Sequence, residues 1–213
     1  MHSEHLQFFL RWLHILFGIA WIGHLYFFNF VNANFAKTLD AATKPKVVPE
    51  LMPRALWWFR WGAMITFLAG IAIVVLKYFV GEGAPGFKSM DGTRGLMVED
   101  RGLLITWGGL LGTIMWFNVW FVIWPRQQKI ITCVKKGQKP PEMDHWVKVA
   151  GLASKANTYL SGPMLLFMAA GSHAGDFGIT HDLKWLGIIL VAGFVLIHLL
   201  FQMAPKIVPW KMD

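Results

Sequence analysis

The sequence predicts an all-α integral membrane protein, a bundle of about five transmembrane helices that forms one domain over residues 1–213. Hydrophobic residues make up 55% of the chain and charged residues only 15%, which is atypical of a soluble domain. Apolar runs of roughly 20 residues, long enough to cross about 30 Å of hydrocarbon, recur along it. The expected spans are 6–30, 57–79, 103–124, 157–172 and 183–203.

Two of these spans need a separate argument. The leader MHSEHLQFF contains no Lys or Arg, and the apolar run 6–30 is longer than an ordinary signal-peptide core, so we expect a mature helix there. The span 157–172 is short and carries Pro163 near its start, a position where the first helical turn tolerates proline.

The distribution of charge predicts how the chain lies in the membrane. The net charge is +8, and Lys and Arg concentrate in the segments 32–56 and 125–156 and in the carboxyl-terminal tail. The segment 80–102 instead mixes both signs. Cationic loops normally remain in the cytoplasm, so we expect the amino terminus outside and the carboxyl terminus in the cytoplasm of a bacterial-type inner membrane. This topology explains the positive charge without a nucleic-acid partner.

Two connecting segments each allow two interpretations. The stretch from Pro125 to Gly137 has helix start and stop signals, and it could lie on the inner leaflet or extend the third span. The segment 81–102 is rich in glycine and has no apolar period. It could be a flexible linker or a segment that a partner subunit orders.

Four histidines are the candidate site residues. His14 and His24 fall in the first span and His198 in the fifth, while His173 lies at the outer end of the fourth. An ionisable side chain in lipid is costly, and histidine is a frequent haem ligand. His14 and His24 differ by about 80° and about 15 Å, so they cannot share one metal ion. Helix rise instead pairs His14 with His173 and His24 with His198 by depth, which predicts one or two b-type haems.

Other patterns limit the alternatives. A histidine in a membrane helix can also serve only as a hydrogen-bonding group between helices, and this is the role we expect for Asn118 and Asn157. The single Cys133 excludes a CxxCH haem attachment and a four-cysteine iron–sulfur site within this chain. The expected spans contain no carboxylate, which disfavours a proton-coupled transporter. There is also no HExxH, GxSxG or glycine-rich phosphate loop.

Several segments resemble, in the same order, the amino-terminal membrane domain of the membrane-bound urate hydroxylases. They are RWLHILFGIAWIG at 11–23, WWFRWGAMITFLAG at 57–70, GTIMWFNVWFVIWPRQQK at 112–129, KANTYLSGPMLLFM at 155–168, and the surroundings of His173 and His198. Family members commonly carry histidine at the positions of His14, His173 and His198. This chain is similar to a short form that lacks the cytochrome c domain and some middle spans. It has Ala156 where a histidine is usual, and His24 where a small residue is usual.

The resemblance implies a membrane redox protein that passes electrons toward cytochrome c. Three hypotheses follow for this chain. It is an electron-transfer subunit that binds haem and works with a cytochrome c or another membrane oxidoreductase subunit, or it hydroxylates urate or a related purine with a separate cytochrome c as acceptor. The third is an anchoring subunit without redox chemistry. Assembly of the chain into a homo-oligomer stays open in each case.

Overall fold

The computed structural model describes residues 2–81, 83–173 and 183–207, and this part of the chain contains helices and loops but no strand. The predicted all-α fold class is therefore confirmed. The helical segments are α1 (His2–Tyr26), η1 (Phe27–Asn32), α2 (Ala33–Thr38), α3 (Lys44–Tyr78), α4 (Asp100–Phe117), η2 (Asn118–Ile123), α5 (Trp124–Lys135), α6 (Met143–Ser172), α8 (Leu183–Met203) and η4 (Ala204–Lys206).

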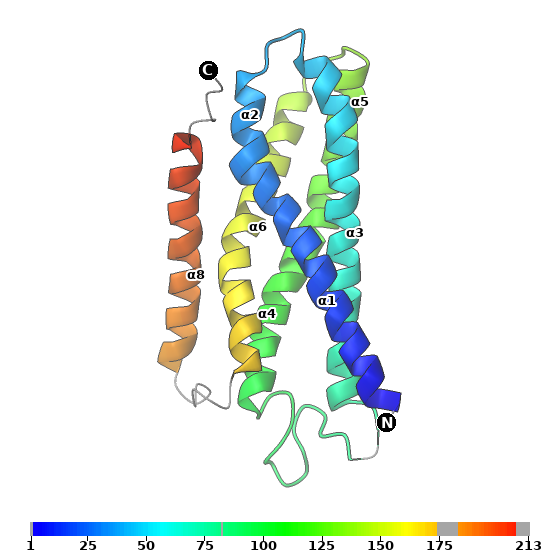
Figure 1. Ribbon diagram of the computed structural model, residues 1–213, viewed down its shortest axis with the longest axis vertical. Helices are drawn as coiled ribbons and strands as arrows, with labels where there is room; N and C mark the ends of the chain where they lie inside the picture. The colour runs from blue at the N-terminus through cyan, green and yellow to red at the C-terminus, as the bar shows by residue number, and fades with distance from the viewer. Residues whose placement is uncertain (1, 82, 174–182, 208–213) are drawn as a thin grey trace, which may run out of the picture.

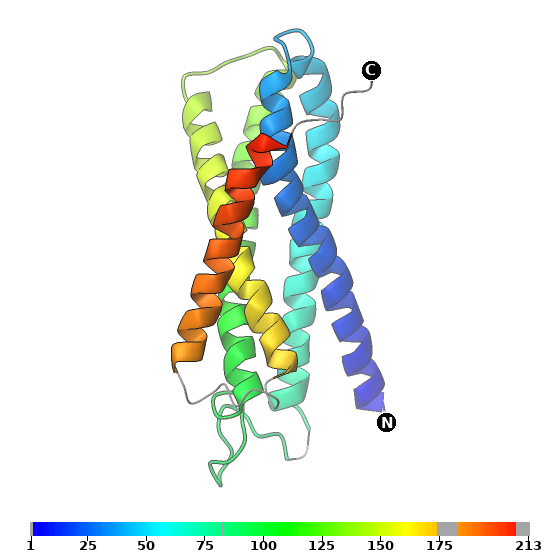
Figure 2. The same cartoon turned by 60° about the vertical axis from the view of Figure 1, so that its left-hand side comes forward.

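These segments join into five long rods that run up and down the bundle (Figure 1). The rods α1–η1–α2 and α4–η2–α5 are each continuous, because helical geometry persists through the wider π-helical turns η1 and η2. The first rod crosses α3 diagonally, and α6 packs between α4 and α8. After a turn of the view, α8 comes to the front of the bundle and crosses α6, which it contacts (Figure 2).

Four of the rods are long and apolar enough to cross a membrane by length and composition: Glu4–Thr38, Lys44–Tyr78, Asp100–Lys135 and Lys184–Lys206. The chain is therefore a multi-pass membrane protein. The remaining rod, α6, contains the expected span 157–172 but is not among these four. Its Asn157, Thr158 and Ser161 are fully buried, so neighbouring helices rather than lipid surround the polar groups that lower its hydropathy.

The helices extend past the expected spans. The first rod continues to Thr38, and α3 already begins at Lys44. The third span continues through α5 without a break, which favours the interpretation of the segment after Pro125 as an extension of that span. The positive φ of Gly137, +65°, follows the end of this helix, in agreement with the predicted stop signal.

The glycine-rich segment between α3 and α4 is held by hydrogen bonds within the chain. The Leu96 amide donates to the Gly86 carbonyl (3.0 Å), and the Met97 amide donates to the Phe87 carbonyl (3.0 Å). At Gly95, where φ is +132°, a β-carbon would lie 2.5 Å from the Phe87 carbonyl oxygen, so only glycine fits. The segment is thus ordered by its own contacts, which neither of the two sequence-based interpretations anticipated.

A turn in this segment makes a prediction about pH. The Asp91 carboxylate accepts hydrogen bonds from the Ser89 hydroxyl and the Thr93 amide, and these bonds lower its pKa from 3.8 to about 2. Its contribution to the turn should be complete above pH 3.8 and disappear as the pH falls through about 2. NMR titration of the side-chain carboxyl carbon measures this midpoint, and a midpoint near 3.8 would contradict the bonded turn.

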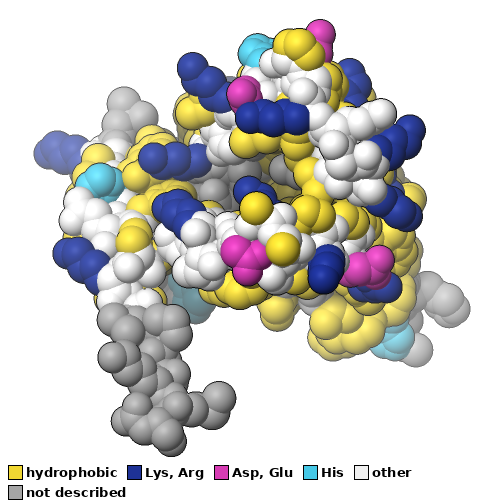
Figure 3. Space-filling view, turned by 90° about the horizontal axis from the view of Figure 1, so that it is seen from above, with side chains coloured by type: hydrophobic (Ala, Val, Ile, Leu, Met, Phe, Trp, Pro, Cys, Tyr) yellow, Lys and Arg dark blue, Asp and Glu magenta, His cyan; other side chains and the backbone are white. Residues whose placement is uncertain are grey.

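The two ends of the bundle differ in charge. Figure 3 looks onto the end formed by the α2–α3 and α5–α6 connections, where Lys and Arg side chains surround a central hollow. We call this the basic end. Its exposed lysines include Lys37, Lys44, Lys46, Lys129, Lys135, Lys136, Lys139 and Lys148. The other end mixes Lys88, Arg94 and Arg101 with acidic residues, so the predicted charge asymmetry is present.

Candidate functional site

A row of hydrogen-bonded polar side chains, which we call the polar track, lies along the buried face of α6. The side-chain amide of Asn118 donates to the side-chain carbonyl of Asn157 (2.8 Å), and the Asn157 amide donates to the backbone carbonyl of Met115 (2.9 Å). Asn118 is the first residue of η2, which lies beside α6. The predicted role of these two asparagines as hydrogen-bonding groups between helices is confirmed.

Polar side chains of the same track also form hydrogen bonds between α6 and the first rod. Asn29, inside η1, donates to the Ser154 hydroxyl (2.8 Å), and the hydroxyls of Tyr26 and Ser161 are 3.0 Å apart. Each π-helical segment therefore presents an asparagine to α6, and such wider turns within helices frequently occur at functional sites. The track joins α1, η2 and α6 through polar groups in the apolar interior.

His14 is fixed between α1 and α3. Its Nδ1 lies 2.8 Å from the Thr66 carbonyl oxygen. A carbonyl can only accept, so Nδ1 carries the proton and Nε2 of the neutral ring keeps its lone pair. A β-carbon on Gly70 would lie 3.0 Å from Cε1 and 3.2 Å from Nδ1 of the ring. The position of the imidazole therefore depends on glycine at residue 70.

Replacing Gly70 by alanine should push the His14 ring off the Thr66 carbonyl. Overpacking of this kind costs about 1–3 kcal/mol of unfolding free energy. Unfolding in mixed micelles measures the cost, and Gly109→Ala, whose β-carbon would meet nothing within 4 Å, is the control. In a His14→Ala background the same Gly70→Ala change should cost little, because the clashing ring is absent. An equal cost in both backgrounds would contradict this packing.

His24 has a different environment from His14. Its Nδ1 donates to the Ala20 carbonyl of its own helix (2.7 Å), so a neutral ring would have its lone pair on Nε2. The ring lines an open groove of about 510 Å³ between α1 and α3, together with Phe27, Leu51 and Trp58. This groove is mainly apolar, and Tyr26, which contacts α6, is not among the residues that line it.

His173 ends α6 and is exposed. Its Nδ1 donates to the Ala169 carbonyl (3.1 Å), the same arrangement as in His24. His198 is exposed but uses both nitrogens: the Gln202 amide donates to Nε2 (2.8 Å), and Nδ1 lies 3.1 Å from the Tyr159 hydroxyl. With Nε2 accepting, Nδ1 is the donor to Tyr159.

The four predicted histidines thus have separate neighbours. His14 contacts α3 and His198 contacts α6, whereas His24 lines a groove together with residues of α3. Within residues 2–81, 83–173 and 183–207, no hydrogen bond joins two histidines, and no three His, Cys, Asp or Glu side chains are grouped to hold a metal ion. Two-ligand haem binding needs only a pair, so the predicted pairing stays a prediction.

The membrane-crossing helices and the hydrogen bonds of the interior define the chain as a multi-pass helical membrane protein. Its central helix, α6, is hydrogen-bonded to its neighbours. A protein-family model described as urate oxidase N-terminal matches residues 39–85 and 93–211. The chain belongs to this family, as the sequence resemblance predicted. No curated protein and no solved structure was found to match the chain. The matched residues include His173 and His198, while His14 and His24 precede them.

Arg60 is a candidate that the pattern of histidines does not reveal. It lies within the membrane-crossing helix α3 and contacts the rings of Trp61, Trp120 and Trp124. The signal in the sequence is a lone arginine at the start of the apolar run 57–79. Its tryptophan neighbours on η2 and α5 are about 60 residues away in the chain, so only the packed structure reveals them.

Proposed function

We propose that the chain is a redox subunit of a bacterial-type inner membrane, with the amino terminus outside, that binds b-type haem through histidines and transfers electrons to a cytochrome c or another membrane oxidoreductase subunit. Membership of the urate oxidase N-terminal family supports a link to oxidative chemistry. The cationic side chains of the basic end support the orientation.

One observation carries the haem proposal. At His14, His24 and His173 the Nδ1 group donates to a backbone carbonyl, so Nε2 is free to bind iron. Metal-binding histidines commonly have this second hydrogen bond, which fixes the tautomer and makes the ligand more basic. The chemistry of these donors therefore fits haem. When bound, haem supplies a one-electron redox centre.

The environment of each of the four histidines determines how well it suits haem binding. His14 is the principal ligand, because Thr66 orients its ring and Gly70 gives it room. His173 is its proposed partner. His198 would have to release Gln202 before its Nε2 could bind iron. His24 lies in a groove against α3 rather than toward α8, so a haem shared between His24 and His198 is the weaker arrangement.

A pyridine haemochrome spectrum of the purified protein tests the proposal. We expect one or two haems per chain, and loss of one haem in His14→Ala. The control is His145→Ala, an exposed residue at the start of α6, which should retain all haem. Circular dichroism checks that both variants remain helical. A colourless wild-type protein would overturn the proposal, and a colourless subunit that stays in a stable complex would indicate an anchor.

The family assignment also favours a second candidate, hydroxylation of urate or a related purine with a separate cytochrome c as acceptor. Oxygen-18 from labelled water should then appear in the product, and turnover should depend on His14 and His173. Unchanged turnover in both alanine variants would remove the histidines from the active site. Product without the label would exclude water as the oxygen source.

A further inference from the structure

Arg60 is the fourth residue of the apolar run 57–79 and carries a positive charge within helix α3. It is sixteen residues from Lys44, about 24 Å along α3, and a similar distance from Tyr78. A charged side chain within an apolar run is costly unless something compensates the charge, and it is a functional candidate by default. The chemistry around its guanidinium therefore indicates what compensates it.

Three tryptophan rings surround this guanidinium. Its central carbon lies 3.9 Å from the ring centroid of Trp124, 5.1 Å from that of Trp120 and 5.8 Å from that of Trp61. The Trp61 and Trp120 rings also meet edge to face, 5.6 Å apart. We call Arg60 and these three rings the arginine cage. The aromatic faces attract the cation, but they carry no formal negative charge.

The cage contains donors without acceptors. Arg60 Nε and the indole nitrogen of Trp120 are both buried and have no hydrogen-bond partner in the described part of the chain. The ion pairs among the described residues involve Arg54, Lys77 and Lys139, so no carboxylate there neutralises Arg60. Guanidinium and indole groups can only donate, and buried donors in folded proteins are normally satisfied. An acceptor for these donors beside a cation is most favourably an anion.

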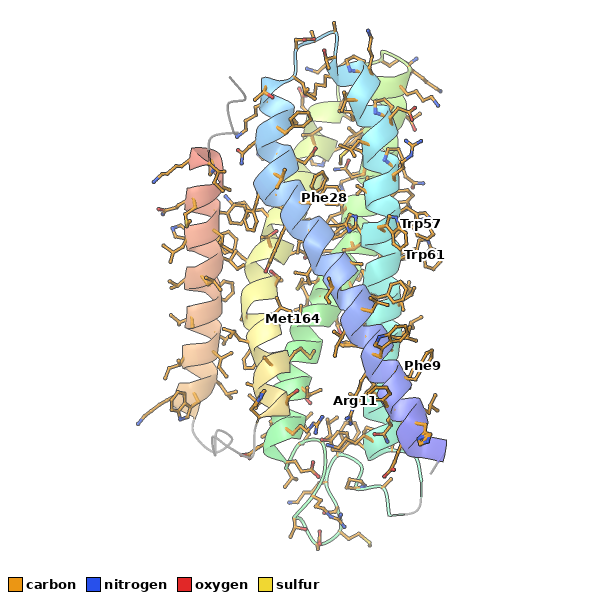
Figure 4. All side chains as sticks on the ribbon, viewed as in Figure 1. Phe9, Arg11, Phe28, Trp57, Trp61 and Met164 are labelled. Atoms are coloured by element: carbon orange, nitrogen blue, oxygen red, sulfur yellow. The ribbon has the colours of Figure 1, made fainter. Side chains whose placement is uncertain are left out.

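The arginine cage is connected to the basic end through α5. The nearest ring, Trp124, begins α5, which runs on to the lysines of that end. Arg60 itself is only partly buried. Exposed lysines surround the hollow of this end (Figure 3), and a surface of one sign raises the local concentration of the opposite ion. Trp57 and Trp61 project from the flank of α3 at the outside of the bundle (Figure 4), so lipid also reaches this level.

We propose that the arginine cage binds a small oxyanion of the phosphate type. The planar guanidinium presents parallel N–H donors that match two oxygens of such an anion. The indole nitrogen of Trp120, a second buried donor without a partner among the described residues, belongs to the same cage. This chemistry suits either the phosphate of an anionic phospholipid or a dissolved oxyanion. The site involves none of the four histidines, so it extends beyond the proposed redox function.

Two binding measurements on the full chain in neutral micelles test the site. Calorimetric titration uses inorganic phosphate, and native mass spectrometry measures retention of phosphatidylglycerol against uncharged diacylglycerol. The wild type should bind at least one of the two anions saturably, and Arg60→Gln should bind about tenfold more weakly, since it loses a charge-assisted hydrogen bond to the anion. The control Arg54→Gln removes an exposed arginine of the same helix that pairs with Glu50, and it should bind like the wild type.

The outcomes separate the sources of the anion. Binding of inorganic phosphate assigns the cage to a dissolved oxyanion, and retention of phosphatidylglycerol alone assigns it to lipid. Arg60→Lys keeps the charge but loses the planar fork, so it should also bind more weakly, and it decides the question where Arg60→Gln does not fold. Absence of saturable binding in the wild type, or equal affinity in the wild type and either variant, would overturn the site. Neither measurement depends on haem.

Discussion

Replacing Gly193 by alanine is expected to separate α8 from the rest of the bundle. Gly193 and Gly162 face each other where α8 crosses α6, and a β-carbon on Gly193 would lie 2.6 Å from the α-carbon of Pro163 and 2.7 Å from the carbonyl carbon of Gly162. A β-carbon on Gly162 would likewise overlap the Gly193 carbonyl. Small residues permit such close backbone contact between membrane helices, and that contact provides much of their association energy.

The loss of unfolding free energy in Gly193→Ala should reach roughly 3 kcal/mol, because both clashing partners are backbone atoms that cannot rotate away. Unfolding in mixed micelles measures it. The matched control is Gly187→Ala in the same helix, where an added β-carbon meets nothing within 4 Å. This control should change stability by less than about 0.5 kcal/mol. Equal stability of the two variants would show that α6 and α8 are not in backbone contact.

Replacing Asn157 by leucine should have the second largest effect. The side chain is fully buried, and its amide is bonded to Asn118 on one side and to the Met115 carbonyl on the other. Leucine would leave both groups unpaired in an apolar interior. Bonds between membrane helices contribute about 1–2 kcal/mol each, so we expect a loss of roughly 2 kcal/mol.

The control for this variant is Asn34→Leu, since the Asn34 amide bonds only to the Phe30 carbonyl of its own helix. It should lose less than about 0.5 kcal/mol. Asn118→Ala in an Asn157→Leu background should add little further loss, because the shared bond is already broken. Additive losses would indicate that the two asparagines act independently.

The sequence predicted some parts of the candidate site and not others. His14 was identifiable because an ionisable group interrupts an apolar run. Its partners Thr66 and Gly70 were not, because residues on another helix select the direction of the ring. The role of Asn118 and Asn157 followed from their position near two spans. Helix rise gave the depths of the histidines but not their neighbours: His24 lines a groove with residues of α3, and His198 bonds to Tyr159 on α6.

The central position of α6 could also not be predicted from the sequence. Hydropathy places 157–172 as a short span, yet the helix runs from Met143 to Ser172 and packs against both α4 and α8. Polar residues lower the apolar signal of a helix regardless of what surrounds them. When neighbouring helices satisfy those residues, a weakly hydrophobic segment becomes the interior of the bundle.

The sequence by itself determined that this protein is an all-α membrane protein with one basic end, because a chain in lipid must satisfy its backbone hydrogen bonds within helices. It also shows which ionisable side chains interrupt apolar runs, among them His14, His24, His198 and Arg60. Only the tertiary structure decided their neighbours: Thr66 for His14, Gln202 for His198, and three tryptophans for Arg60. Those contacts depend on the rotation and crossing of helices, which arise from packing between residues distant in the chain.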